Sequence, residues 1–129
     1  MGRYYGGFRL VMKRKILIWL DDERVIPDRW LQSIGYPDVC DVVCCKTGEH
    51  CIEWLDKHAN EYRIWIAFDH DLGYGITGYD VAKYIVENQI AIEGFSCHSM
   101  NPVGVKNILG IMTHYGYQKT KSLGDIYYG

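Results

Sequence analysis

The sequence predicts an α/β domain in which helices cover both faces of a parallel sheet. Unbroken apolar runs at 16–20 and 64–68 each stop at a group of acidic residues. Such runs, rich in β-branched and aromatic residues, are typical of strands that are buried on both faces. Helical patterns alternate with the runs, which favours a parallel sheet. We therefore expect a three-layer domain with strand order 2-1-3-4-5, which places the first and third strands side by side.

The individual elements follow from local patterns. Strands are expected at 16–20, 39–45, 64–68 and 94–98, with a short further strand at 117–121. Helices are expected to begin near 48, 78 and 102, with Thr47 and Asn101 as N-caps of the first and last. Pro27 interrupts a possible helix at 23–36, so that stretch is either a short helix or a loop with one turn. The last helix is expected to bury Val105, Ile108, Leu109, Met112 and Tyr115, and a further helix after it to be short or missing.

Composition limits the class of protein. A chain of 129 residues suits a single domain, expected at 16–129 with an extension at 1–15. The net charge of −2 gives no reason to expect an extended nucleic-acid surface, and no apolar stretch has membrane-spanning length. The cysteine count is odd and lacks ligand spacing, which predicts free, small buried thiols in a reducing, cytoplasmic setting, without zinc or disulfides. These cysteines are Cys40, Cys44, Cys45, Cys51 and Cys97.

Acidic residues follow two strands that are expected to be neighbours. Asp21 and Asp22 come directly after the first apolar run, and Asp69 follows the run at 64–68. Like charges at one sheet edge repel unless a cation holds them. Oxygen-rich clusters suit a hard ion, so we expect Mg²⁺ or Mn²⁺ here. The alternative is that these residues are ordinary helix caps at strand-to-helix turns.

Polar residues after the expected fourth strand add further chemistry. His98 and Ser99 precede Asn101 and Pro102, which suit a helix start. The amides at a helix N-terminus bind phosphate well, and His98 adds a group that titrates near neutral pH. Together with His70 and Asp71, these residues suit metal-assisted phosphoester chemistry. Taken alone, Asn-Pro would be a plain helix cap.

The motifs together resemble those of the cyclic-phosphate processing receiver-like domain family, a divergent branch of the response-regulator receiver fold. The motifs are an acidic pair followed by x-Arg at 21–24, Asp-His-Asp-Leu-Gly at 69–73, Thr-Gly-Tyr-Asp at 77–80 and His-Ser-x-Asn-Pro-x-Gly at 98–104. The resemblance covers 16–117. It implies a flavodoxin-like fold and action on cyclic phosphates, such as 2′,3′-cyclic RNA ends, in phage and bacterial conflict or RNA repair.

These considerations give a leading hypothesis, a metal-dependent phosphoesterase that acts on a cyclic nucleotide or a cyclic RNA end. The metal set is Asp21, Asp22 and Asp69; the proton-transfer set is His70 and His98, with Asp71 orienting His70; the phosphate set is Ser99, Asn101 and Arg24. The alternative is a non-catalytic receiver-like module, phosphorylated on Asp69 or sensing a nucleotide. Ordinary receivers carry a Lys after strand five and Ser or Thr after strand four. Lys119 or Lys121, and Ser96 or Ser99, could fill those places.

Overall fold

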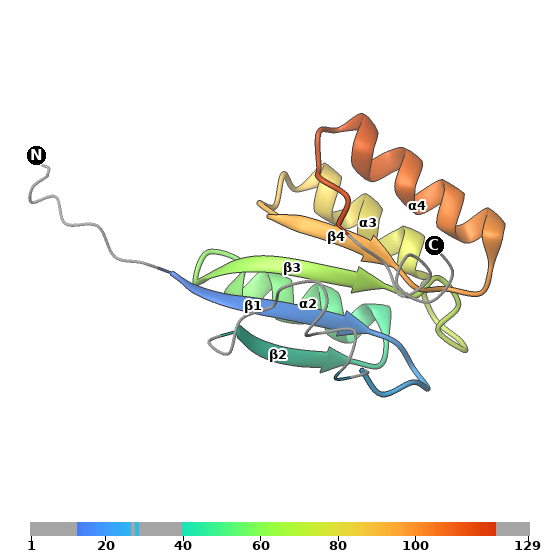
Figure 1. The fold of residues 1–129 in the computed structure, drawn as a ribbon, viewed down its shortest axis with the longest axis horizontal. Helices are drawn as coiled ribbons and strands as arrows, with labels where there is room; N and C mark the ends of the chain where they lie inside the picture. Colours follow the sequence, from blue (N-terminus) through green and yellow to red (C-terminus); the bar gives the residue numbers. More distant parts are fainter. Residues whose placement is uncertain (1–12, 27, 29–39, 121–129) are drawn as a thin grey trace, which may run out of the picture.

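The protein folds around a parallel sheet. The structure is a computed structural model, and it describes residues 13–26, 28 and 40–120. Its strands are β1 (Arg14–Leu20), β2 (Cys40–Cys45), β3 (Tyr62–Phe68) and β4 (Gly94–Cys97). They lie in the order β2-β1-β3-β4, as Figure 1 shows. The register pairs Leu20 with both Cys45 and Phe68, and Phe68 with Cys97. The carboxyl ends of all these strands therefore meet at one edge.

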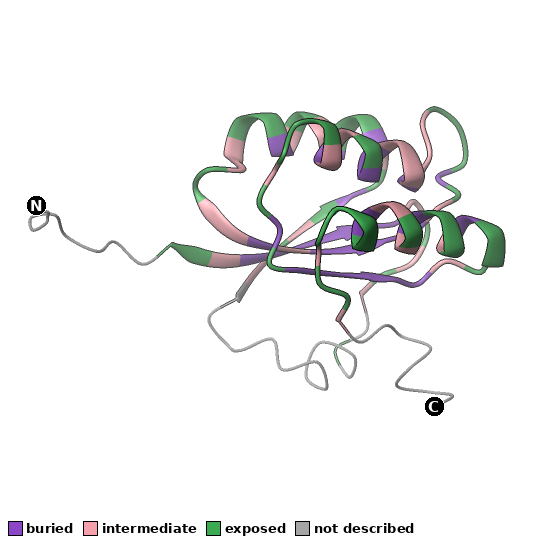
Figure 2. Ribbon diagram, turned by 90° about the horizontal axis from the view of Figure 1, so that it is seen from above, coloured by how far each residue is buried: buried purple, intermediate pink, exposed green. Residues whose placement is uncertain are grey.

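Helices pack in chain order against one face of the sheet. They are α2 (Gly48–His58), α3 (Gly78–Glu87) and α4 (Pro102–His114), and α3 lies between the other two (Figure 1). Their inward side chains, such as Leu55, Ile85 and Ile108, share one buried core with Ile18 and Ile66 of the sheet. Figure 2 shows the buried residues along the sheet and on the inner sides of the helices.

Polar caps fix where the helices begin. The Thr47 hydroxyl accepts a hydrogen bond from the backbone N–H of His50 at the start of α2. Thr77 and Asp80 form a reciprocal capping box at α3, in which each side chain bonds to the other residue's backbone N–H. Asn101 caps α4 by accepting from the N–H of Gly104, and Pro102 occupies the first turn.

Most of the expected architecture is confirmed, with differences at the last strand and the last helix. The helices α2, α3 and α4 lie on one face, so the helix layer expected on the other face stays a prediction. Beyond β4 the expected strand is reduced to one bridge between Phe95 and Lys119. Tyr115 was expected in the buried stripe of α4, but it is the exposed C-cap of that helix, one residue beyond its last turn. The expected helix at 23–36 lies largely outside the described residues; 23–26 are not helical.

Buried cysteines contribute to the core as small apolar side chains. Cys45, Cys51 and Cys97 are buried, as expected, whereas Cys44 is exposed because its side chain lies on the opposite face of the edge strand β2. The side chain of Cys40 lies outside the described set. Among the described residues, no helix is long and apolar enough to cross a membrane.

Candidate functional site

Residues that directly follow three of the strands meet at the carboxyl edge of the sheet. The backbone ladder continues one residue past each strand: Asp69 N–H donates to the Leu20 carbonyl, and His98 N–H donates to that of Phe68. Asp21, one residue past β1, donates in the same way to the carbonyl of Cys45. The ladder thereby fixes the backbones of Asp21, Asp69 and His98 side by side. This edge is where ligands bind in open α/β sheets.

The Asp21 carboxylate is buried and accepts hydrogen bonds at both oxygens. Its Oδ1 accepts from the backbone N–H groups of Glu23 and Arg24, each at 2.8 Å. Its Oδ2 lies 3.0 Å from Nε of Arg24 and 3.0 Å from Nε2 of His98. Burial alone would raise the pKa of Asp21, but the hydrogen bonds from His98 and the backbone outweigh it and lower the pKa. Four contacts use the acceptor positions of one carboxylate.

His98 is part of the scaffold around Asp21. Its ring is fully buried and stacks on the Trp19 indole, with centroids 4.0 Å apart and an interplanar angle of 4°. The Trp19 indole N–H donates to the Arg24 carbonyl, and Arg24 Nη2 donates to the carbonyl of His98. The result is a closed ring of contacts among four residues, Asp21, Arg24, Trp19 and His98, that uses their side chains and two backbone carbonyls. The His98 imidazole is fully buried and His98 is not among the residues that line the pocket at this edge. This geometry gives it a positioning role, and the expected acid or base role stays a prediction.

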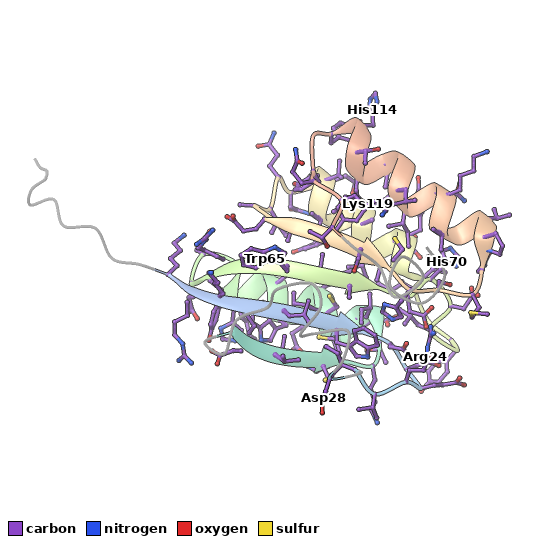
Figure 3. All side chains as sticks on the ribbon, viewed as in Figure 1. Arg24, Asp28, Trp65, His70, His114 and Lys119 are labelled. Carbon is purple, nitrogen blue, oxygen red and sulfur yellow. The ribbon has the colours of Figure 1, made fainter. Side chains whose placement is uncertain are left out.

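Arg24 is held at the edge of the site by the same ring of contacts. Its side chain is 38% exposed, and its Nη2 also lies 3.9 Å from Oδ1 of Asp69. Among the described residues, its Nη1 has no hydrogen-bond partner. Figure 3 shows Arg24 at the carboxyl edge of the sheet, the edge at which His70 also lies. A guanidinium fixed in this way can present donors to a phosphate without losing much side-chain entropy.

Asp69 is the second buried carboxylate of the site. Its Oδ1 accepts a hydrogen bond from the His70 N–H at 2.9 Å, and the nearby Ser99 side chain acts to lower the pKa of this carboxyl. Burial, followed by the negative charge of Asp21, raises the pKa of Asp69. Gly78 packs directly on its backbone, since a Cβ at Gly78 would stand only 1.9 Å from the Asp69 carbonyl oxygen. A neighbouring cation would therefore relieve the repulsion between these two carboxylates.

His70 and Asp71 form a hydrogen-bonded pair beside the start of α4. The Nδ1 of His70 lies 2.8 Å from Oδ1 of Asp71, and this hydrogen bond lowers the pKa of Asp71. The Asn101 amide donates to both oxygens of Asp71 at 3.3 Å. Gly104 leaves the space for the imidazole, because a Cβ there would stand 2.3 Å from Cγ of His70. The His98–Gly104 motif thus positions the Asp69–Gly73 motif.

The N-terminus of α4 uses part of its expected phosphate-binding capacity within the protein. Pro102 has no N–H, the N–H of Gly104 donates to the Asn101 side chain, and that of Val105 donates to the Asn101 carbonyl. Asn101 is used as a cap and as a donor to Asp71. Ser99 and Arg24 therefore remain as the phosphate-binding candidates from the expected set.

These groups surround a pocket of about 450 Å³. The pocket is lined by Asp21, Asp22, Glu23, Arg24, Asp69, Asp71, Gly73, Ser99 and Met100. Three of the expected site residues are not among the lining residues: His70, His98 and Asn101. Glu23, Gly73 and Met100 were not among the expected site residues, although each lies within one of the motifs at 21–24, 69–73 and 98–104. Trp19 was also missed, since an indole in an apolar run predicts only a buried strand.

Comparison with known proteins places the chain in a family. The model of the family described as "Cyclic-phosphate processing Receiver domain" matches residues 16–114, which is most of the chain. The chain belongs to this family. The family description relates the domain to the processing of cyclic phosphates, and it agrees with the motifs that build the pocket wall. No curated protein matches.

Solved structures with the same fold include signalling receivers. One is the signal receiver domain of a putative LuxO repressor protein from Vibrio parahaemolyticus, at 17% identity and a TM-score of 0.57, covering 82% of this chain and 75% of that one. Another is a fusion that contains the trimeric coiled coil of yeast Spc42, at 23% identity and a TM-score of 0.57, covering 91% and 74%. At these identities the likeness shows the fold alone. The domain therefore has a flavodoxin-like receiver fold.

The Ser or Thr and the Lys that ordinary receivers carry after strands four and five have candidate counterparts in this structure. Ser99, rather than Ser96, lies beside Asp69, because Ser96 is buried within β4. Lys119 pairs with Phe95, which is level with Ile66 in the sheet, and it does not line the pocket. Figure 3 shows Lys119 beside β4, back from the edge where Arg24 lies. Lys121 lies outside the described residues.

The carboxylates fit a divalent cation, with unequal roles. Asp21, Asp22 and Asp69 each place one oxygen within 4.8 Å of the others. Asp21 already accepts four hydrogen bonds, so it has no free lone pair for direct coordination of a metal. It contributes negative charge to the site instead. Asp22 is half-buried, and its Oδ2 lies next to Gly73, whose φ of +79° suits glycine. Mg²⁺ commonly takes one or two carboxylates together with waters and substrate phosphate, which matches Asp22 and Asp69.

Proposed function

We propose that this chain hydrolyses a cyclic phosphate on a nucleotide or an RNA end, with Mg²⁺ or Mn²⁺ bound at the carboxyl edge of the sheet. The supporting observation is that Arg24, two available carboxylates and Asp71 line one pocket. The family description points to the same class of substrate. The biological setting in this proposal is phage and bacterial conflict or RNA repair, in the cytoplasm.

The proposed reaction is hydrolysis of one ester bond in the ring. Water attacks the phosphorus, the bond from phosphorus to one sugar oxygen breaks, and a proton reaches that oxygen, so that a phosphomonoester and a free hydroxyl are formed. His70 and Asp71 act as one proton-accepting unit. Asp71 lines the pocket and accepts the proton of the attacking water, while the Nδ1–H of His70 donates to Asp71 Oδ1 at 2.8 Å and holds the carboxylate in place. The same pair can return the proton to the leaving oxygen.

The remaining residues hold the substrate and the cation. Asp22 and Asp69 would bind the metal, whose charge offsets theirs and lowers the pKa of bound water. Arg24 donates to a phosphate oxygen through its Nη1, since its other nitrogens are engaged with Asp21 and His98. Ser99 lies on the pocket wall and adds a hydroxyl donor. Asn101 positions Asp71.

A second candidate is a non-catalytic receiver-like module. Asp69 follows β3 and lines the pocket, and the fold is shared with signal receivers, so phosphorylation of Asp69 or nucleotide sensing is a real alternative. The position of Lys119 away from the pocket disfavours phosphotransfer, and the His70–Asp71 pair has no use in it.

The test is to incubate the full chain and Mn²⁺ or Mg²⁺ with 2′,3′-cyclic nucleotides, 3′,5′-cyclic nucleotides, cyclic dinucleotides and 2′,3′-cyclic RNA ends. Formation of a phosphomonoester is followed by ³¹P NMR. His70→Ala and Asp71→Asn should each lower turnover by roughly 10²- to 10⁴-fold. Glu87→Gln, an exposed carboxylate on α3, is the control and should leave turnover unchanged. An Asp69 adduct with beryllofluoride or acetyl phosphate, without hydrolysis of any substrate, would promote the receiver-like module.

A further inference from the structure

Exposed apolar side chains occur in the segments that line the acidic pocket and in residues next to those segments. Among the described residues, the large apolar side chains that face water at this edge of the sheet are Val25, Tyr74, Met100 and Val103. Tyr74 and Met100 are each 87% exposed. Met100 lines the pocket next to Ser99, and Tyr74 directly follows Gly73, which lines it from the β3 side. Met100 therefore lines the polar pocket itself, and Tyr74 is next in sequence to a residue that lines it from another motif.

Tyr74 stands at the tip of a turn that is anchored on both sides. The Tyr74 N–H donates to the carbonyl of Leu72, and the flanking Gly73 and Gly75 have φ values of +79° and +85°. A Cβ on Gly75 would stand 2.7 Å from Oε2 of Glu49, and Ile76 N–H donates to the same carboxylate. The backbone thus fixes where an exposed aromatic ring is presented, although the ring gains little burial itself.

We propose that Tyr74 and Met100 form a binding site for the nucleobase of the substrate and make the chain specific for nucleoside cyclic phosphates over cyclic phosphates that lack a base. This inference rests on the proposed function of the same pocket. A base is flat, largely uncharged and has a face that stacks on aromatic rings, and a Met thioether contacts such a ring favourably.

The charge of the pocket favours a short ligand over a long strand. Asp22, Glu23 and Asp71 line it, and Arg24 is the cation of its described wall. Carboxylates would repel the many phosphates of an extended backbone, whereas one cyclic phosphate can be neutralised by Arg24 and one bound cation. The preferred ligand is therefore a mononucleotide or the terminal nucleotide of a strand.

The experiment compares two substrates and three variants in the full chain with Mn²⁺. Adenosine 2′,3′-cyclic phosphate carries a base, and glycerol 1,2-cyclic phosphate does not. Tyr74→Ala should raise KM for the adenosine compound roughly 5- to 150-fold, as expected for lost base stacking, and leave KM for the glycerol compound unchanged. Tyr74→Phe should keep near-normal KM. Tyr115→Ala is the matched control, since Tyr115 is 61% exposed at the far end of α4.

Binding gives a readout that does not need turnover. The affinity for adenosine 2′,3′-cyclic phosphate is measured by calorimetry in the wild type, Tyr74→Ala and Met100→Ala. Weaker binding in both variants, without hydrolysis in any, would support the base site while rejecting the phosphoesterase. Equal losses for both substrates, unchanged affinity in Tyr74→Ala, or no binding of the adenosine compound by the wild type would overturn the base site.

Discussion

The Nε2 atom of His98 lies 3.0 Å from Oδ2 of Asp21, and both side chains are buried. Arg24 Nε donates to the same oxygen, and the backbone N–H groups of Glu23 and Arg24 donate to Oδ1. Asp21 in turn raises the pKa of Asp69. His98 does not line the pocket, but through its contact with Asp21 it influences the ionisation of Asp69, which does.

We expect His98→Ala to destabilise the fold more than it alters the chemistry. The change removes a donor to a buried carboxylate and the ring stacked on Trp19, which should lower the free energy of unfolding by about 1–3 kcal/mol. Urea unfolding measures it, and His50→Ala on the exposed side of α2 should change little. Unchanged stability together with loss of one limb of the pH–rate profile would instead make His98 an acid or base.

Asp21 should make the protein sensitive to acid. Its pKa in the folded state lies below the ordinary value of 3.8, so it stabilises the fold above that pH and loses this contribution as the pH falls through the folded-state pKa. Asp21→Asn should be less stable than the wild type at pH 7 and should lose less stability between about pH 5 and pH 2. Melting temperatures across that range test this, with Glu87→Gln as control. Parallel curves for wild type and Asp21→Asn would contradict it.

The effect of Asp69→Asn on the melting temperature should change sign between chelator and metal. Its pKa is raised in the fold, so its ionised form costs stability at neutral pH when no cation is present. In chelator, Asp69→Asn should therefore melt at or above the wild-type temperature. With Mn²⁺ the wild type should gain more, because a ligand that binds the folded state stabilises it.

The same thermal-shift series includes further variants. Asp22→Asn should also show a reduced metal-induced shift, whereas Glu87→Gln should keep the wild-type shift. Identical melting of the wild type with metal and with chelator would argue against a cation site at Asp22 and Asp69.

The parts of the fold that sequence could predict are those with local signals. The apolar runs at 16–20 and 64–68 predict buried parallel strands, and Thr47 and Asn101 mark helix starts. Because parallel strands end at a common edge, the neighbourhood of Asp21 and Asp69 followed from the strand order. The final strand could not be predicted well, since a single bridge at Lys119 leaves no periodic pattern.

Side-chain burial at the site could not be predicted from local patterns. His98 follows a strand and precedes a helix cap, a place where a histidine could face solvent or pack inward. Its burial depends on Trp19, which is distant in sequence but stacks on it in the fold. The number of backbone N–H groups at the start of α4 that could bind a phosphate also could not be predicted. It depends on the cap geometry, in which the Asn101 side chain accepts from the N–H of Gly104.

Two glycines of α4 should respond in opposite ways to the same substitution. Gly110 has nothing within 4 Å of an added Cβ, so Gly110→Ala should stabilise the protein by roughly 0.5–1 kcal/mol through higher helix propensity. In Gly104→Ala, the new methyl group would overlap the His70 ring, with Cγ at 2.3 Å. The ring must move, and its contact with Asp71 should be lost or lengthened.

The Gly104→Ala variant should therefore lose turnover, and the ¹⁵N shifts of the His70 imidazole should change, while Gly110→Ala keeps both as in the wild type. Urea unfolding of the two variants separates a local effect on His70 from a general loss of stability. If Gly104→Ala leaves the His70 signals and turnover unchanged, then the close packing of His70 on α4 does not position the His70–Asp71 pair, and the proton-transfer role of that pair loses its structural support.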